Sequence, residues 1–455
     1  MTIKLKMKNS IGLVLLCILA VSVLPMSALS TSTNPVTITV AVWDINEPEV
    51  RATAEDFNKQ WGQELGIAVR VEPIAREVLR EKEGTALMAR TGAYDIVYVP
   101  SEWIAEFAEG GLLESLDKYM ADPTLPFHSD KNDWASPGMV EGYKYKGELY
   151  GLPIYSDTVL LFYRTDLFKQ YGIVDAEGNP KPPETWVEYL EDAKKLTIDT
   201  DGDGKIDIYG STIYGKLPES IAWDYINYLW SFGAEILDEN YCPIINNKEG
   251  IDSLEYFVNL YRLYKVVPPG SPTYEYPEVD MAFKEGKVAM AIHWNAAYRG
   301  FLDPEQSPKI QDKWAATVLP GRLMPDGTIL RKTIGHVWGF AMDASSKNKK
   351  EAYTALVYFT GKEGIMNWAQ GPMGILGNSK AVLADSQIFA AHPEASLLDE
   401  AFKYVQLWPN TTITHDIILA IALEASEALA GTKTPQEALD DCATKIDKLT
   451  KKAGY

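Results

Sequence analysis

The stretch VTITVAVW, residues 36–43, decides the fold of this chain. Residues 36–42 are mostly β-branched and begin with an alternation of Val or Ile with Thr, a pattern that predicts a strand over 36–42. A loop at 44–48 and a helix at 50–61 follow, and then a strand at 68–73, a helix ending at Arg90 and a strand at 95–99. This alternation of strands and helices predicts a right-handed parallel sheet in an α/β domain. In such sheets, ligands bind beyond the carboxyl ends of the strands.

A second informative stretch is YGLPIYSDTVLLFYRTD, residues 150–166, where a Gly-Leu-Pro turn leads into a long apolar strand. We interpret it as a segment that crosses between two lobes. Helical patterns are predicted at 166–171, 183–196, 221–232, 250–264, 349–359, 414–430 and 435–452. The helix at 183–196 is expected to have Pro183 at its start, followed by carboxylates in its early turns. No long low-complexity linker separates the two halves, as expected if the lobes share several crossings.

The amino-terminal residues have the three-part layout of a secretory signal peptide, predicted over residues 1–30. Three lysines precede the apolar run 11–24, and the small residues Ala28 and Ser30 follow it. Cleavage is expected after Ser30 or, alternatively, after Ala28. A retained membrane anchor is the other interpretation, but the apolar run is shorter than the roughly 20 residues that a span needs. We therefore expect an exported protein, in a periplasm or on the outer face of the cytoplasmic membrane.

Composition and motifs exclude several classes of function. A formal net charge of −20 opposes binding to nucleic acid. The five histidines show no paired metal-ligand spacing, and no Gly-x-Ser-x-Gly elbow or phosphate-binding loop occurs. A glycosidase needs only two carboxylates, so this class stays open. Cys242 and Cys442 can either form a disulfide in an oxidising compartment or remain free thiols.

An acidic loop, DTDGDGKID at residues 199–207, predicts a structural Ca²⁺ site. Alternating aspartates around a glycine resemble an EF-hand loop, in which carboxylates turn inward onto a hard cation. Gly210, however, stands where a complete loop of this kind has a glutamate, so a merely solvated acidic turn is the alternative. The candidate ligands are Asp199, Asp201, Asp203, Lys205 and Asp207. No organic cofactor is expected.

Aromatic residues next to carboxylates or amides recur at predicted strand ends and turns. The chain holds 12 Trp and 25 Tyr, enough for several such pairs. Sugars present apolar C–H faces to aromatic rings and hydroxyls to carboxylates, so sugar pockets combine the two residue types. Any single pair is also compatible with packing in the core. The pairs are Trp43-Asp44, Glu102-Trp103, Tyr155 with Asp157, Trp223-Asp224, Trp294-Asn295 and Trp408 with Asn410.

The order of several segments resembles the extracellular solute-binding proteins of ABC importers, the group that includes maltose-binding protein. The resemblance lies in residues 36–43, in GAYDIVYVPSEWIAEFAEGGLLESLD at 92–117, in the crossing strand from Tyr150, in PPETWVEYLEDAKKLT at 182–197, in FKEGKVAMAIHWN at 283–295 and in GHVWGFAMDASSKNKKEAYTALVYFT at 335–360. It continues in the helical segment after Trp408. Each segment is weak alone, but their order and spacing are specific.

This resemblance implies a type II two-lobed fold, in which each lobe is a central sheet flanked by helices and a hinge of crossing segments joins the lobes. Lobe I is expected to comprise 31–155 and 336–378, and lobe II 156–335 and 379–455. The implied function is capture of a sugar or oligosaccharide in the interlobe cleft and its delivery to a membrane permease, without catalysis and as a monomer. Two departures from the family pattern, Tyr163-Arg164 and Gly335-His336, affect the expected cleft chemistry rather than the fold.

Ligand contacts are expected on the loops after the early strands, on the first crossing and on the facing lobe. Carried onto this sequence, these regions hold Trp43, Asp44, Ser101, Glu102, Tyr155, Asp157, Trp223, Asp224, Trp294, Trp338 and Trp408. The alternatives are a binding protein for a polyamine or another cationic solute, since acidic loops and aromatic faces also suit ammonium groups, and a secreted glycosidase.

Overall fold

The first strand, β1 (Val36–Trp43), pairs with β2 (Ile67–Ile74) along its whole length, in parallel and in the register Val36 to Ile67. β1 also pairs in parallel with β3 (Ile96–Pro100), which confirms the predicted start of the sheet. The computed structural model describes residues 35–455, and the predicted signal peptide lies outside them. Among the described residues, no helix combines the length and the apolar character needed to cross a membrane.

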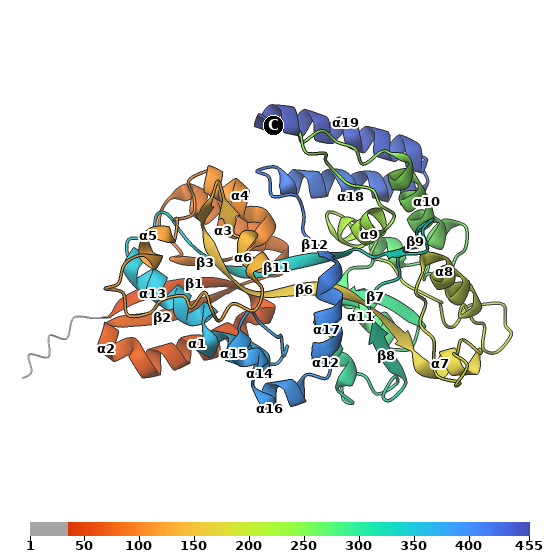
Figure 1. Cartoon of the computed structure of the whole chain (residues 1–455), viewed down its shortest axis with the longest axis horizontal. Helices are drawn as coiled ribbons and strands as arrows, with labels where there is room; N and C mark the ends of the chain where they lie inside the picture. The colour runs from red at the N-terminus through yellow and green to blue at the C-terminus, as the bar shows by residue number, and fades with distance from the viewer. Residues whose placement is uncertain (1–34) are drawn as a thin grey trace, which may run out of the picture. The chain divides into compact units, whose positions relative to one another are not determined.

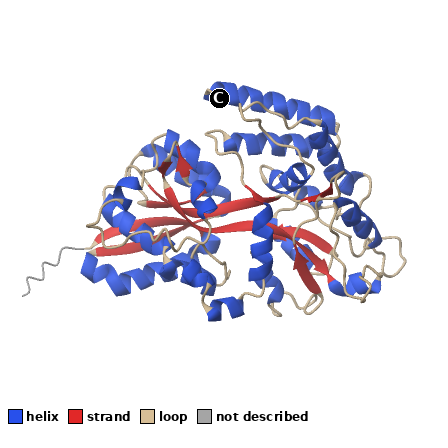
Figure 2. Ribbon diagram, viewed as in Figure 1, coloured by secondary structure: helices blue, strands red, loops and turns tan. Residues whose placement is uncertain are grey.

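The sheet is mixed rather than purely parallel. Its order is β2-β1-β3-β11-β6-β7, where β7 spans Met290–Trp294, and β12 (Val405–Gln406) pairs with β11 and β8 (Trp314–Thr317) with β6. The long strands β6 (Gly151–Arg164) and β11 (Thr333–Met342) run antiparallel to each other and extend through both halves of the described chain (Figures 1 and 2). Every residue of both strands is buried, so these crossings form the centre of the molecule.

Helices cover the sheet on both sides of these crossings (Figure 2). The remaining elements are α1 (Glu47–Phe57), α2 (Gln63–Leu65), α3 (Arg76–Ala89), α4 (Ser101–Glu109), α5 (Asp117–Met120), α6 (Pro137–Glu141), β4 (Lys144–Tyr145), β5 (Glu148–Leu149), α7 (Thr165–Gln170), α8 (Trp186–Lys195), α9 (Ser220–Ser231), α10 (Lys248–Arg262), α11 (Tyr276–Lys284), α12 (Ala297–Leu302), β9 (Arg322–Leu323), β10 (Ile329–Leu330), α13 (Lys349–Thr360), α14 (Lys362–Gln370), α15 (Lys380–Leu383), α16 (Ser386–Ala391), α17 (Ala395–Ala401), α18 (Thr414–Ala430) and α19 (Pro435–Ala453).

Three hydrophobic clusters form the core and define the two lobes. One cluster packs residues 38–155 of the chain against 337–388, and it forms the core of lobe I. The other two draw on residues 159–334 together with the segment from Leu398 onward, and they form lobe II. The lobe boundaries given above, at 155/156, 335/336 and 378/379, stay predictions. The α/β two-lobed fold itself agrees with the expectation from the sequence.

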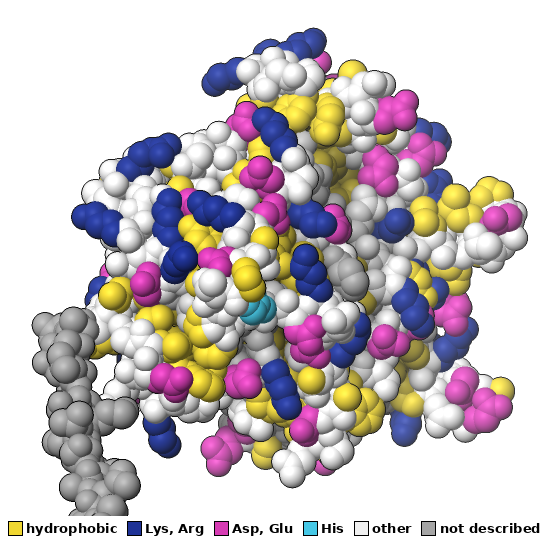
Figure 3. Space-filling model, turned by 60° about the vertical axis from the view of Figure 1, so that its left-hand side comes forward, with side chains coloured by type: hydrophobic (Ala, Val, Ile, Leu, Met, Phe, Trp, Pro, Cys, Tyr) yellow, Lys and Arg dark blue, Asp and Glu magenta, His cyan; other side chains and the backbone are white. Residues whose placement is uncertain are grey.

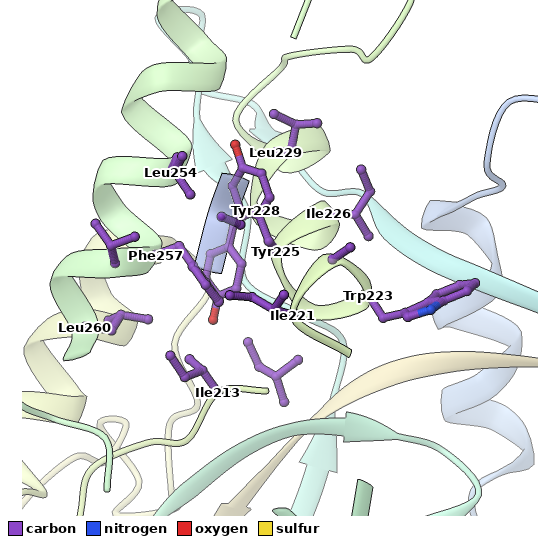
Figure 4. Packing of buried hydrophobic residues seen from close by; sticks show 14 of the residues in the cluster. Ile213, Ile221, Trp223, Tyr225, Ile226, Tyr228, Leu229, Leu254, Phe257 and Leu260 are labelled. Atoms are coloured by element: carbon purple, nitrogen blue, oxygen red, sulfur yellow. The ribbon is translucent and has the colours of Figure 1, made fainter. Parts of the chain in front are cut away.

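The large core of lobe II is built around α9, a helix that is buried along almost its whole length. Eleven of its twelve residues are buried, and Tyr225, Tyr228 and Leu229 pack toward Leu254 and Phe257 of α10 (Figure 4). Tyr228 and Phe257 have ring centroids 5.3 Å apart. Trp223 leaves this helix in another direction, toward the cleft described below (Figure 4).

Two local expectations are corrected by the structure. The predicted loop at 44–48 is a short 3-10 turn, Asp44–Asn46, followed directly by α1. Helix α8 begins at Trp186 rather than at Pro183, because Thr185 caps it and Glu188 completes a capping box. Of the two alternatives for the cysteines, the structure has free thiols: Cys242 is exposed, Cys442 is buried, and they are not bonded to each other.

Candidate ligand-binding cleft

A cavity of about 750 Å³ lies between the residues of lobe I and those of lobe II. It opens at the carboxyl end of β1, where Trp43 and Asp44 leave the sheet, as expected for a sheet of this kind. Its lining consists of Trp43, Asp44, Ile45, Arg76, Tyr155, Asp157, Tyr214, Lys216, Ser220, Trp223, Glu275, Tyr276, Pro277, Glu278, Trp294, Ala296, His336, Trp338 and Met373.

Lobe I contributes an aromatic wall from two strands. Trp338 of β11 stacks on Tyr98 of β3, with ring centroids 4.7 Å apart and planes 6° from parallel. The ring of Trp43 lies 5.9 Å from that of Trp338. The hydroxyls of Tyr98 and Tyr155 are 2.9 Å apart in the core behind this wall. The Trp338 ring is therefore held in one orientation before any ligand binds.

Lobe II contributes the facing aromatic wall. The rings of Trp223 and Trp294 meet edge to face at 6.0 Å, and Trp408 packs behind Trp223 at 5.4 Å. His336 lies between the two walls, since its ring is 4.5 Å from Trp223 and 4.6 Å from Trp338. Aromatic faces thus line the cavity from both lobes, an arrangement suited to the apolar faces of a ring or chain.

The central carboxyl group of the cavity is that of Asp157, on β6. It is 9% exposed, and its Oδ1 atom has no hydrogen-bond partner among the described residues. Burial raises the pKa of Asp157 to about 7, while the charges of His336 and Arg76 act in the opposite direction. An unpartnered buried oxygen is costly, so a hydroxyl donor from a ligand would relieve it.

The carboxyl group of Glu102 holds His336 in place from behind. His336 Nε2 lies 2.9 Å from Glu102 Oε1, and both side chains are buried. Because His336 is directly opposite Asp157 in the β6–β11 pairing, this contact fixes the side chain that faces the central carboxyl. Glu102 acts on the cavity through His336 and is not itself part of the lining.

A charged group lies at the edge of the cavity. Glu275 accepts a hydrogen bond from Lys216 Nζ at 2.5 Å and lies 3.8 Å from Arg76 Nε. Glu275 also caps α11 in a capping box with Glu278. Arg76 belongs to lobe I and Glu275 to lobe II, so this contact joins the two lobes across the cleft.

Seven of the eleven residues predicted from the sequence line the cavity, and four do not. The seven are Trp43, Asp44, Tyr155, Asp157, Trp223, Trp294 and Trp338. Ser101 begins α4, beside Glu102. Asp224 is turned into lobe II, where its Oδ2 accepts from the Tyr214 backbone N–H at 2.9 Å and burial raises its pKa to about 8. Trp408 supports Trp223 from behind.

Sequence reasoning missed part of the lining, chiefly Arg76, Tyr214, Lys216, Glu275, Tyr276 and His336. Arg76 could have been found, because it is the first helical residue after the predicted second strand and so lies at the binding edge of the sheet. Tyr214, Lys216 and Glu275 come from irregular segments and Tyr276 begins α11, and no local pattern marks these side chains as cavity-facing. His336 lies inside β11, and its only signal in the sequence was the departure from the family pattern at Gly335-His336.

The acidic loop lies apart from this cavity. Carboxylate oxygens of Asp199, Asp201 and Asp207 come within 4.8 Å of one another. Asp203 is outside this group, and its Oδ1 accepts from the backbone N–H of Lys205 at 2.8 Å. The Asp199 carboxylate accepts from the N–H groups of Gly202 and Gly204, which lowers its pKa. Calcium binding at this loop stays a prediction.

A cleft between two α/β lobes, crossed by two long strands and lined with aromatic rings and carboxyls, defines a protein that encloses a small solute. The family model of bacterial extracellular solute-binding proteins matches residues 45–366, and the chain belongs to that family. The resemblance drawn from the sequence is thereby confirmed.

Relatives and solved structures cover nearly the whole described chain. The mannitol-binding protein of Pseudomonas aeruginosa is 25% identical over 413 residues, which are 86% of this chain and 88% of that protein. A solute-binding protein of Agrobacterium vitis, solved with bound D-mannitol, is 26% identical with a TM-score of 0.73 and covers 92% of this chain and 99% of its own. Maltose-bound MalE3 of T. maritima has a TM-score of 0.77 at 24% identity, and the match covers 91% of this chain and 100% of MalE3. This likeness supports the fold alone.

Proposed function

We propose that this chain is the exported solute-binding component of an ABC importer and captures a neutral carbohydrate, a sugar or sugar alcohol, for a membrane permease. The observation that carries this proposal is the cavity itself, where Trp43 and Trp338 face Trp223 and Trp294 around the buried carboxyl of Asp157. Ring faces suit C–H surfaces, and an unpartnered carboxyl oxygen suits a hydroxyl donor. The sugar-alcohol and sugar ligands named for similar proteins support this choice.

Calorimetric titration against a panel of ligands tests the proposal. The panel contains D-mannitol, monosaccharides, maltose and longer oligosaccharides, together with spermidine and amino acids. We expect saturable binding of at least one carbohydrate, accompanied by a change in tryptophan fluorescence because four Trp rings line the cavity. A response to spermidine with silence across all carbohydrates would instead support the cationic-solute alternative.

The proposed absence of catalysis has its own test. A glycosidase would need two carboxyl groups on opposite sides of the scissile bond, and the cavity lining offers those of Asp44, Asp157, Glu275 and Glu278. Long incubation with oligosaccharide should produce no new reducing ends. Release of product by the wild type that stops in the Asp157→Asn variant would establish an enzyme instead.

A further inference from the structure

Arg76 occupies an unusual position in the cleft. It begins α3 directly after β2, and its guanidinium carbon lies 4.8 Å from the centre of the Trp43 ring. Its Nε atom faces Glu275 Oε1 of the other lobe at 3.8 Å, beyond hydrogen-bond distance. The side chain is 43% exposed and lines the cavity. A cation–π contact with Trp43 and an ion pair with Glu275 thus orient the guanidinium.

The N–H donors of Arg76 are uncommitted. Within residues 35–455 its guanidinium donates no hydrogen bond to a protein acceptor. The hydrogen bond to Glu275 comes instead from Lys216. A guanidinium has a rigid fork of donors that matches two adjacent oxygen atoms, a match that an ammonium group cannot reproduce. The terminal donors of Arg76 are therefore available to a ligand in the cavity.

Charge decides which pair of oxygens fits. The cavity also holds the carboxyl groups of Asp44, Asp157, Glu275 and Glu278, which outnumber its Arg and Lys side chains. These negative groups would repel an anionic ligand, whereas a neutral polyol carries no charge for them to repel. Adjacent hydroxyl oxygens of a neutral carbohydrate are thus the better acceptors.

We propose that Arg76 is a specificity-determining residue that donates two parallel hydrogen bonds to adjacent hydroxyl oxygens of a neutral carbohydrate, with Trp43 and Glu275 holding its guanidinium in place. This inference rests on the proposed function and adds a named contact to it. It assigns a direct ligand-binding role to Arg76, because its contacts with Trp43 and Glu275 leave its N–H donors without a hydrogen-bond acceptor in the described protein.

The test compares Arg76→Lys, Arg76→Met and Glu275→Gln with wild type, using D-mannitol and maltose as calorimetric probes. Arg70→Lys is the matched control, since Arg70 lies on β2 outside the cavity and pairs with Glu72 at 3.4 Å. Because an ammonium group keeps the charge but cannot donate two parallel hydrogen bonds, Arg76→Lys should weaken binding of the recognised probe about 10- to 100-fold, and Arg70→Lys should leave it unchanged. Circular dichroism verifies that each variant is folded.

The outcomes separate the two levels of the proposal. If wild type binds neither probe nor any carbohydrate of the panel, the proposed function and the role of Arg76 fall together. If wild type binds but Arg76→Lys retains its affinity, the proposed function stands and the role of Arg76 is overturned. Glu275→Gln should weaken binding less than Arg76→Lys, because Trp43 still contacts the guanidinium. An Arg76→Met variant that keeps wild-type affinity also overturns the role of Arg76, because methionine has no N–H donor to offer the ligand.

Discussion

At the scale of single residues, the buried carboxyl of Asp157 lowers the free energy of unfolding by an amount that depends on pH. Its pKa is raised to about 7 by burial, so the folded protein keeps this proton at pH values where the unfolded chain has lost it. The folded state therefore binds more protons between the ordinary aspartate pKa and about 7, and stability falls as pH rises through that window.

The Asp157→Asn variant should remove this cost, because its side chain is neutral at every pH. We expect its gain in free energy of unfolding over wild type to be larger at pH 8 than at pH 5, by on the order of 1 kcal/mol or more. Urea unfolding at both pH values measures it. Asp130→Asn, at an exposed position, is the control and should show no such trend. A change in stability that is the same at both pH values would contradict the assignment.

Trp294 tests the aromatic wall of lobe II, because it is only half-buried and faces the cavity. Replacing it with alanine removes a stacking surface and should weaken carbohydrate binding roughly tenfold, with little loss of secondary structure. Titration of Trp294→Ala against the best ligand of the panel gives the answer. Trp61→Ala is the control, since Trp61 is also half-buried but packs on Phe127 in lobe I and does not line the cleft. Equal effects in the two variants would argue against stacking.

Single-residue patterns predicted the cavity only in part, and the physical reason differs between residues. Trp43 and Asp44 were found because Trp43 ends, and Asp44 directly follows, a strand that the alternation of its residues marks clearly. Asp224 and Trp408 have the same aromatic–polar adjacency, yet they face the interior of lobe II. Adjacency in sequence does not define which side of a helix or loop a side chain occupies; only packing against distant segments does so.

At the scale of elements, the acidic loop at 199–207 is proposed to bind one Ca²⁺ as a structural ion. Three of its aspartates already converge, and Gly202 and Gly204 adopt positive φ angles, which permit the tight turn. Calcium should raise the melting temperature relative to EGTA, since an ion at 100 times its Kd stabilises the fold by about 2.7 kcal/mol.

The Asp199→Asn and Asp201→Asn variants should lose this calcium response and keep carbohydrate binding, because the loop is separate from the cavity. Asp175→Asn is a matched control: Asp175 also accepts two backbone N–H groups in an exposed turn but does not belong to the cluster. Identical melting temperatures in calcium and in EGTA would favour the solvated-turn alternative.

Elements with strong periodicity were predicted well, while their ends and pairings were not. α18 was predicted with its observed bounds, 414–430. The start of α8 was misplaced because a capping Thr185 outweighs the preference of Pro183 for a first turn. The antiparallel insertion of β11 between β3 and β6 was not foreseen, because its partners lie far away in sequence and no local pattern specifies them.

At the scale of the whole molecule, the two lobes should unfold together, because β6 and β11 belong to both. Leu152 and Tyr155 of β6 lie in the lobe I cluster, whereas Val159 and Leu161 of the same strand lie in lobe II. β11 repeats this division between Ile334 and Val337. Neither lobe can lose its core without breaking the pairing of two fully buried strands.

We therefore expect one cooperative transition, with far-ultraviolet circular dichroism and tryptophan fluorescence giving the same midpoint in urea. A carbohydrate that binds across the cleft should raise the free energy of unfolding by about 2.7 kcal/mol at 100 times its Kd. The unfolding midpoints reported by the two signals should then rise together. Two separate transitions, or a ligand that shifts only one signal, would show that the crossings do not couple the lobes. Coupling through these strands is what would let a solute that contacts Trp43 in one lobe and Trp294 in the other stabilise the entire fold.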